Sequence, residues 1–305
     1  MNSDLTLIEK EANLHDKKKS AWLIVNDNQI LDKGNIDGIS MNFKNENDIL
    51  EMKIIVKENT KPENPIHVCF GAIHGKIKQN IKLEIILEKN SSANFFSHCI
   101  LTSKEKIIHN MTATIIIKEN AKYSYVEKHI HSDSGNINID AKTKLIAEKN
   151  SRIRIDYSLV KGRFGNSEFF YDISAGKDSK VEMESKMSLS KDDVGMLDEI
   201  VSLDGKNSSA VVKSRVAVRN DSVMKVKNRI TANCENSVGH IDCSEILLDN
   251  GRTLAYPEAI VNHPKARITH EASLGGIDNK KMESLMARGL SEEEAEDLIL
   301  EGILE

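Results

Sequence analysis

The stretch from Cys234 to Glu271 gathers the side chains best suited to hold a metal. It contains two of the chain's four cysteines, Cys234 and Cys243, together with three of its ten histidines and several acidic residues. Thiolate, imidazole and carboxylate groups are typical of transition-metal sites, and thiolate in particular selects zinc, copper(I) or iron–sulfur centres. The alternative is that these residue types cluster here by chance.

Two further sets of residues have metal-ligand chemistry. His129 and His131 lie two apart in a predicted strand, so they share one face, which is a geometry that can hold a metal. The alternative is a pair of surface or tunnel-lining imidazoles. Cys69 and Cys99 each follow apolar strand residues, and we expect both to be small buried hydrophobic side chains.

The common catalytic motifs are missing from the sequence. The segment 71–76, GAIHGK, resembles a phosphate-binding loop, but one residue is missing between the glycines and no Ser or Thr follows Lys76. No GxSxG, HExxH, GxGxxG or CxxC motif occurs either. The sequence therefore gives no support for a nucleotide hydrolase, a serine hydrolase, a zinc protease or a Rossmann enzyme.

The elements that must position these residues are set by an internal repeat. A short polar turn recurs eight times, and the spacings between the last residues of successive turns are 31, 30, 30, 28, 29, 29 and 28. The eight turns are 57–59 (KEN), 88–90 (EKN), 118–120 (KEN), 148–150 (EKN), 176–178 (GKD), 205–207 (GKN), 234–236 (CEN) and 262–264 (NHP). Self-similarity at a fixed period of this length indicates a repeat architecture.

Strand-like segments flank each turn. Residues 152–157 (RIRIDY) alternate polar with apolar side chains, and no helical period occurs between about 46 and 274. The pattern predicts a parallel β-helix or other β-solenoid, and the alternatives are a β-sandwich or an up-and-down barrel. Residues one coil apart would stack about 4.8 Å from each other. Cys243 would then have His270 or Glu271 as a near neighbour.

The two ends of the chain lack the repeat. Residues 1–45, which include the single tryptophan Trp22, are expected to form a short helix and an irregular cap. Residues 46–275 are expected to form the β-helix, and residues 276–305 a helical hairpin. In that hairpin Asp278 is a candidate N-cap, Gly289 suits a left-handed C-terminal position, and Ser291 with Glu294 forms a capping box.

Composition excludes several classes. The chain has 305 residues, with 42 Lys+Arg against 47 Asp+Glu, so the formal net charge of −5 gives no basic face for nucleic acid. Uncharged apolar stretches are only three or four residues long, so no membrane span is expected. The charged first twenty residues do not resemble a signal peptide, and we expect a cytoplasmic protein whose cysteines are thiols.

Several segments near the end of the chain resemble the C-terminal half of the SufB/SufD family of iron–sulfur cluster assembly proteins. The resemblance rests on an ordered set of motifs and extends more weakly back through residues 123–127, YSYVE, covering about 45–305. The motifs are 239–244 (GHIDCS), 255–257 (AYP), 266–273 (ARITHEAS), 277–278 (ID) and 287–295 (ARGLSEEEA).

This resemblance implies a fold, a site and partners. The fold would be a right-handed parallel β-helix with a C-terminal helical domain. Cys243 would be the cluster-associated cysteine, joined by His270 and Glu271 as metal ligands, and residues 277–304 would dock a SufC-type ABC ATPase. The chain would be a scaffold and not an enzyme. Two copies would assemble a transient iron–sulfur cluster between them and transfer it to apo-proteins. The type of the cluster stays open. Whether Cys234 contributes a ligand and whether flavin binds stay open.

The sequence also departs from the family pattern. In SufB-type chains a cysteine within the β-helix is thought to receive sulfur, and His129 stands at this position here. The chain is short and resembles archaeal-type members. The alternatives are a SufD-like structural subunit that recruits the ATPase without holding a cluster, a carbohydrate-active β-helix of the pectate lyase kind, and a generic interaction solenoid. The aromatic content of 4% disfavours the carbohydrate enzyme.

Overall fold

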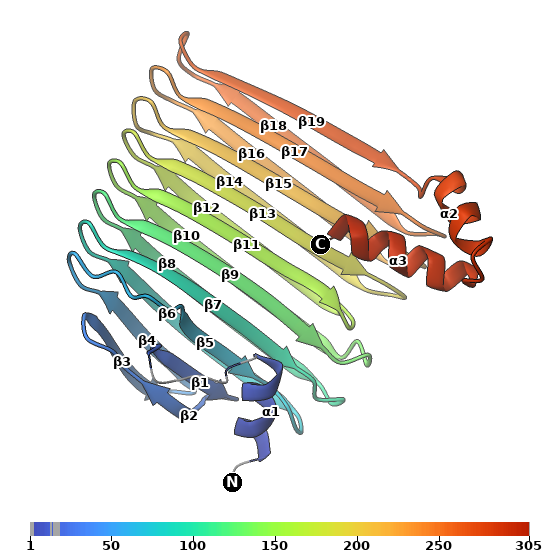
Figure 1. Cartoon of the computed structure of the whole chain (residues 1–305), viewed down its shortest axis with the longest axis horizontal. Helices are drawn as coiled ribbons and strands as arrows, with labels where there is room; N and C mark the ends of the chain where they lie inside the picture. Colours follow the sequence, from blue (N-terminus) through green and yellow to red (C-terminus); the bar gives the residue numbers. More distant parts are fainter. Residues whose placement is uncertain (1–2, 13, 15–18, 305) are drawn as a thin grey trace.

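The chain winds through two long sheets that face each other. A computed structural model describes residues 3–12, 14 and 19–304, and from β4 onward each coil gives one strand to each sheet (Figure 1). In spatial order, sheet A contains β2 (Gln29–Gly34), β1 (Trp22–Asn26), β5 (Ile66–Gly71), β7 (Ser92–Leu101), β9 (Lys122–His131), β11 (Arg152–Lys161), β13 (Lys180–Leu189), β15 (Ser209–Val218), β17 (Val238–Leu247) and β19 (Arg267–Gly275). Sheet B contains β3 (Ile39–Glu46), β4 (Ile49–Val56), β6 (Ile77–Leu87), β8 (Ile107–Ile117), β10 (Ile137–Ala147), β12 (Asn166–Ala175), β14 (Val194–Leu203), β16 (Val223–Ala232) and β18 (Arg252–Val261).

Strand register confirms the predicted β-solenoid. Val194 on β14 pairs with Val223 on β16, which in turn pairs with Arg252 on β18, so each partner lies one coil further along the sequence. Except for β2 and β3, neighbouring strands run parallel. Side chains alternate between the two faces of each strand, and the β-branched and leucine side chains that alternate in the sequence fill the space between the sheets.

The polar turns form a ladder along one edge of the solenoid. Seven of the eight predicted turns end on a residue with positive φ, a conformation that Asn and Asp tolerate better than other residues with a side chain. These residues are Asn59, Asn90, Asn120, Asn150, Asp178, Asn207 and Asn236. The side chain of Asn120 donates to Asn90 over 3.0 Å, and that of Asn150 donates to Asn120 over 2.8 Å. The repeat in the sequence is therefore a repeat of turn geometry and of cross-coil hydrogen bonds.

The N-terminal region contains more strand than the irregular cap that the sequence predicts. β1 continues sheet A by pairing parallel with β5, and β2 and β3 run antiparallel at the ends of the two sheets. Helix α1 (Ser3–Glu11) places Ile8 against Ile24, Cys69 and Ile73. These strands give the first coil hydrogen-bond partners and limit its open edge.

The C-terminal hairpin is built as predicted, from α2 (Asn279–Met286) and α3 (Glu292–Leu304). The carboxylate of Asp278 accepts from the backbone N–H of Lys280 over 2.9 Å and caps α2. The backbone N–H groups of Ser291 and Glu294 each bond to the other residue's side chain, which is a capping box.

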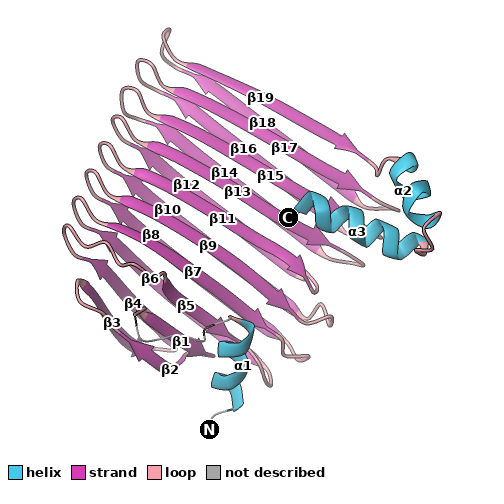
Figure 2. Ribbon diagram, in the orientation of Figure 1, coloured by secondary structure: helices cyan, strands magenta, loops and turns pink. Residues whose placement is uncertain are grey.

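Helices α1, α2 and α3 lie along the edge where the chain returns from sheet A to sheet B (Figure 2). Leu300 and Leu304 of α3 pack on Ala217 of β15 and Ile246 of β17, and Asp297 of α3 accepts from Arg219 over 2.6 Å. The hairpin is thus fastened to the last coils of sheet A. No helix in the described part of the chain is long and apolar enough to span a bilayer.

Candidate functional site

Cys243 lies on the inner face of β17, between the two sheets. Its side chain is almost fully buried, and its thiol donates to the amide oxygen of Asn228 on β16 over 3.2 Å. Ser214 on β15 donates to the same oxygen over 3.2 Å. Burial raises the pKa of the Cys243 thiol to about 11. In this closed arrangement Cys243 is therefore a protonated, shielded thiol, and it becomes a strong ligand only when the thiol is exposed and ionised.

The hydrogen-bond network around Cys243 continues into the solenoid. The amide nitrogen of Asn228 donates to one carboxyl oxygen of Glu199 on β14, and Ser185 on β13 donates to the other over 2.5 Å. Burial raises the pKa of Glu199 to about 8, although both hydrogen bonds oppose this shift. Glu199 is therefore protonated at neutral pH, and an uncharged polar network backs the Cys243 thiol.

His270 and Glu271 both lie on β19, the outermost strand of sheet A. Cys243 pairs in register with Ala272, His270 with Ile241 and Glu271 with Asp242. Because side chains alternate along a strand, His270 shares the inner face with Cys243 while Glu271 projects from the outer face. His270 is two positions from the direct partner of Cys243, which corresponds to roughly 8 Å between Cα atoms. Within one chain, Cys243 and His270 therefore share the inner face, whereas Glu271 lies on the opposite face.

Glu245 is an inner-face acid that the sequence analysis did not single out. It lies two residues after Cys243 on β17, is buried, and has one carboxyl oxygen without a hydrogen-bond partner in the described residues. Burial raises the pKa of Glu245 to about 7. The signal in the sequence was the i, i+2 spacing of Cys243 and Glu245, which puts both on one face of a strand.

Cys234 lies apart from this group. It sits in the turn before β17, where it is partly exposed and its thiol lies 3.0 Å from the backbone oxygen of Asp204. Cys243 is five residues into the strand, so roughly 16 Å of extended chain separates it from the start of β17. Cys234 is therefore outside the group formed by Cys243, His270 and Glu245.

A second polar group lies deeper in the solenoid, on the inner faces of β7 and β9. The thiol of Cys99 donates to a carboxyl oxygen of Glu127 over 3.5 Å, and the same oxygen lies 3.1 Å from Nε2 of His129. Nδ1 of His129 lies 3.1 Å from Nε2 of His131, whose Nδ1 lies 2.8 Å from the backbone oxygen of Arg163. All four side chains are buried.

Burial sets the protonation of this interior group. It raises the pKa of Cys99 well above its ordinary value, with Glu127 adding to the shift, and lowers the pKa of His131 well below its ordinary value. Burial also lowers the pKa of the nearby His109 to about 4, and His109 Nδ1 lies 2.6 Å from the amide oxygen of Gln79. The predicted pairing of His129 and His131 on one strand face is confirmed, and Cys99 is buried as expected but hydrogen-bonded.

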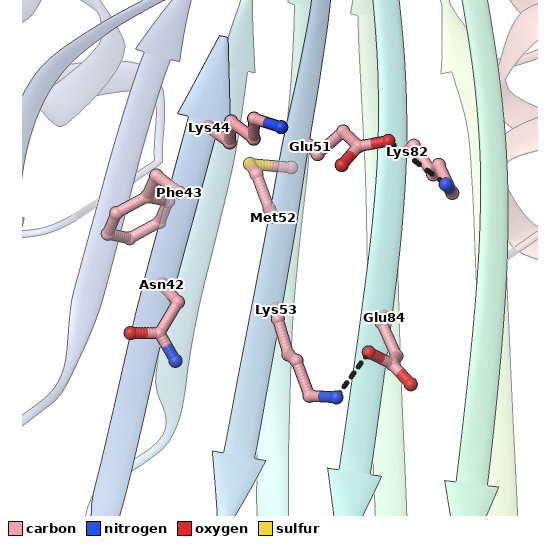
Figure 3. Close-up of a pocket in the computed structure, with 8 residues that line it drawn as sticks. All are labelled: Asn42, Phe43, Lys44, Glu51, Met52, Lys53, Lys82 and Glu84. Atoms are coloured by element: carbon pink, nitrogen blue, oxygen red, sulfur yellow. Dashed lines mark hydrogen bonds and ion pairs between the residues drawn. The ribbon is translucent and has the colours of Figure 1, made fainter.

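The outer surface offers a different kind of hollow near the start of the solenoid. It is lined by residues of β3, β4 and β6, among which Asn42, Lys44 and Glu51 lie on the outer face (Figure 3). Lys82 pairs with Glu51 over 2.9 Å and Lys53 with Glu84 over 2.7 Å, so charges there are matched between neighbouring strands. Its lining contains no thiol or imidazole, and it does not share the metal-ligand chemistry of the interior groups.

The fold and the buried thiols define a class: a parallel β-solenoid with capped ends, a C-terminal helical hairpin, and cysteine, histidine and carboxylate side chains between its sheets. The SUF system FeS cluster assembly SufBD core domain matches residues 73–303. The chain therefore belongs to the SufBD family of iron–sulfur cluster assembly proteins.

Relatives extend this match over most of the chain. This chain is 38% identical over 286 residues to an iron–sulfur cluster assembly SufBD family protein of Methanocaldococcus jannaschii, and the alignment covers 94% of this chain and 90% of that protein. A SufBD family protein of Pyrococcus horikoshii is 31% identical over 284 residues, covering 93% of this chain and 86% of the relative. The similarity thus includes the N-terminal strands that precede the matched core domain.

Proposed function

We propose that this protein is a cytoplasmic scaffold of the SUF-type machinery, one that assembles a nascent iron–sulfur cluster and passes it to apo-proteins. It would act without a catalytic site of its own, in concert with a SufC-type ABC ATPase. The observation that carries the proposal is the position of Cys243, a thiol on the inner face one strand from the open end of the solenoid. His270 shares this face on the edge strand.

The open end of the solenoid supports assembly between two copies. β18 and β19 are the outermost strands of their sheets, and several of their apolar side chains are exposed. These are Leu254, Tyr256, Ile260, Val261 and Leu274. Strand edges and apolar surface of this kind favour pairing with another chain. In a homodimer formed at this end, Glu271 on the outer face would join a site that a single chain leaves incomplete.

The C-terminal hairpin supports a route for the ATPase to act on the site. Leu300 and Leu304 of α3 pack against Ile246, three residues after Cys243 on the same strand. An ATPase that binds the hairpin and moves it would therefore pull on β17. Opening that end would expose the Cys243 thiol, lower its pKa and allow it to bind iron and sulfide. Imidazole and carboxylate are weaker ligands for iron, so the cluster would remain transferable.

The test is anaerobic reconstitution of the full chain with iron and sulfide, with and without the ATPase, read by visible absorption and Mössbauer spectra. We expect a cluster in the wild type and its loss or alteration in Cys243→Ala, His270→Ala and Glu271→Ala. Cys69→Ala is the matched control, because Cys69 is equally buried but lies at the other end of the solenoid. An unchanged cluster in Cys243→Ala would refute the assignment.

A SufD-like structural role is the second candidate, and the burial of Cys243 favours it. In the folded chain the Cys243 thiol is shielded from incoming iron and sulfide, and such a subunit would recruit the ATPase without holding a cluster. No cluster in the wild type under any of these conditions, with the ATPase bound to the hairpin, would establish this alternative. Binding of the ATPase is measured separately with a chain shortened before α2.

A further inference from the structure

The interior group on β7 and β9 has the arrangement of a metal site in its own right. Cys99 and His129 are direct register partners on neighbouring strands, and Glu127 lies two residues before His129 on the same face. The sulfur of Cys99, a carboxylate oxygen of Glu127 and a ring nitrogen of His129 all lie within 4.8 Å of one another. We propose that Cys99, Glu127 and His129 form a three-ligand site for a divalent transition-metal ion, Zn²⁺ or Fe²⁺.

The distances between the donor atoms suit tetrahedral coordination. With metal–sulfur bonds of about 2.3 Å and metal–oxygen or metal–nitrogen bonds of about 2.0 Å, tetrahedral geometry places sulfur and oxygen about 3.5 Å apart and nitrogen and oxygen about 3.3 Å apart. The structure has 3.5 Å between Cys99 Sγ and Glu127 Oε1, and 3.1 Å between His129 Nε2 and that oxygen. Two of the three distances between donor atoms therefore match tetrahedral geometry, and the third, between the sulfur and the ring nitrogen, is below 4.8 Å.

The hydrogen bonds behind His129 direct a lone pair toward the site. A backbone oxygen only accepts, so the bond to the oxygen of Arg163 places a hydrogen on Nδ1 of His131. Nε2 of neutral His131 then accepts from Nδ1 of His129, and Nε2 of His129 carries its lone pair toward Glu127. Metal-bound histidines in proteins usually donate their second ring N–H in this way, which fixes the ring and its tautomer.

The three ligands are buried among aromatic side chains. The ring of His129 packs against Tyr157 and Phe169, with centroids 5.0 and 5.8 Å away. The hydroxyl groups of Tyr123 and Tyr157 are buried without a hydrogen-bond partner in the described residues. A cavity of about 20 Å³, lined by Glu127 and Tyr123 among others, has room for one water. Of the three ligands, only Glu127 lines this cavity, so a water there would lie on the Glu127 side of the site.

The competing arrangement is a proton in place of the metal. A proton between His129 and Glu127 would make a buried ion pair, with the Cys99 thiol donating to the same carboxylate. Binding of the metal ion expels the thiol proton of Cys99, forms the sulfur–metal bond, and displaces any proton held between His129 and Glu127. The reaction needs no oxidant or reductant.

The site is also separate from Cys243, because five strand spacings of about 4.8 Å, roughly 24 Å in total, separate β7 from β17.

The test refolds the full chain from denaturant in chelator-treated buffer with Zn²⁺, Fe²⁺ or Co²⁺, since the site is closed once the chain has folded. Bound metal is counted by elemental analysis, and Co²⁺ reports tetrahedral thiolate coordination in its absorption spectrum. Cys99→Ser and His129→Gln are compared with Cys69→Ser, a buried cysteine outside the group, and with His98→Gln on the outer face of β7. Circular dichroism of the metal-free proteins checks that each variant folds.

We expect one equivalent of metal in the wild type and in both controls, with a thiolate-to-cobalt band. Cys99→Ser should lose that band, and both site variants should lose at least about tenfold in affinity. A wild type that refolds without metal, or site variants that bind as the controls do, would overturn the proposal in favour of the proton-bridged pair. Cys243→Ala separates this result from cluster assembly, because this variant should still bind one equivalent of metal when it refolds.

Discussion

Glu199 is a buried carboxylic acid whose proton is coupled to folding. Its side chain is fully shielded between the sheets, and burial raises its pKa from an ordinary 4.5 to about 8. Below pH 4.5 the folded and unfolded chains both hold this proton. Above that pH the unfolded chain releases it while the folded chain keeps it, so stability is lost as the pH rises toward about 8.

The size of this effect follows from the pKa difference. Each pH unit between the two pKa values changes the free energy of unfolding by about 1.4 kcal/mol. Between about pH 5.5 and about pH 7.5, Glu199 should therefore remove about 3 kcal/mol of stability. Glu199→Gln abolishes the titration and keeps the packing, because the amide oxygen can accept from Asn228 while the amide nitrogen donates to the hydroxyl of Ser185.

The assay is urea unfolding of both proteins across this pH range, with the free energy extrapolated to water. The stability of Glu199→Gln relative to the wild type should rise by about 3 kcal/mol between the two ends of the range. The pKa of Glu245 is also raised, but Glu245 titrates in both proteins, so its contribution to the pH dependence of stability cancels in the difference. Glu168→Gln, on an exposed position of sheet B, is the matched control and should leave the slope unchanged. Equal slopes for Glu199→Gln and the wild type would show that Glu199 is ionised in the folded protein.

Three further predictions concern the turns, the hairpin and the thiols. In urea unfolding, Asn120→Ala should lose about 1 kcal/mol more stability than Asn120→Gly, because glycine adopts the positive φ of this turn without strain and alanine does not. Equal losses would show that only the ladder hydrogen bonds contribute to stability at this position. Leu300→Ala should weaken the packing of α3 on the solenoid by about 2 kcal/mol. Amide hydrogen exchange in α3 should then become faster, with β9 as the internal control. Unchanged exchange in α3 would contradict its packing on Ile246. In the native protein an alkylating reagent followed by peptide mass spectrometry should modify Cys234 first, since the other three cysteines are buried; early labelling of Cys243 would show that the end of the solenoid opens without the ATPase.

The repeat made most of the fold predictable, because its signal is local and recurs. Turns such as 118–120 and 148–150 combine a residue suited to positive φ with a ladder bond to the next coil, so both spacing and residue type mark them. The strands β2 and β3 escaped prediction because each occurs once and pairs antiparallel. Period analysis detects what is repeated and misses strands that only close an edge.

The site was harder to predict because strand register depends on turn length. The sequence places Cys243 near both His270 and Glu271, yet the coil at this point spans 29 residues, which makes Ala272 the direct partner of Cys243. Alternation then puts His270 on the same face and Glu271 on the opposite one. Cys99 and His129 are 30 residues apart and meet directly for the same reason. A change of one residue in a turn would have exchanged which side chains face the interior.

The interior polar groups are costly to fold around, which argues for a functional origin. Apolar side chains fill most inner positions of the solenoid. An apolar residue in place of Glu199 or Glu127 would avoid the cost of burying a carboxyl group. The two groups also differ in kind. The network from Glu199 to Cys243 is uncharged at neutral pH and ends at the open coil, whereas Cys99, Glu127 and His129 converge on one point in a closed coil. A network held neutral is suited to a thiol that reacts only after opening, while converging donors are suited to an ion that stays bound.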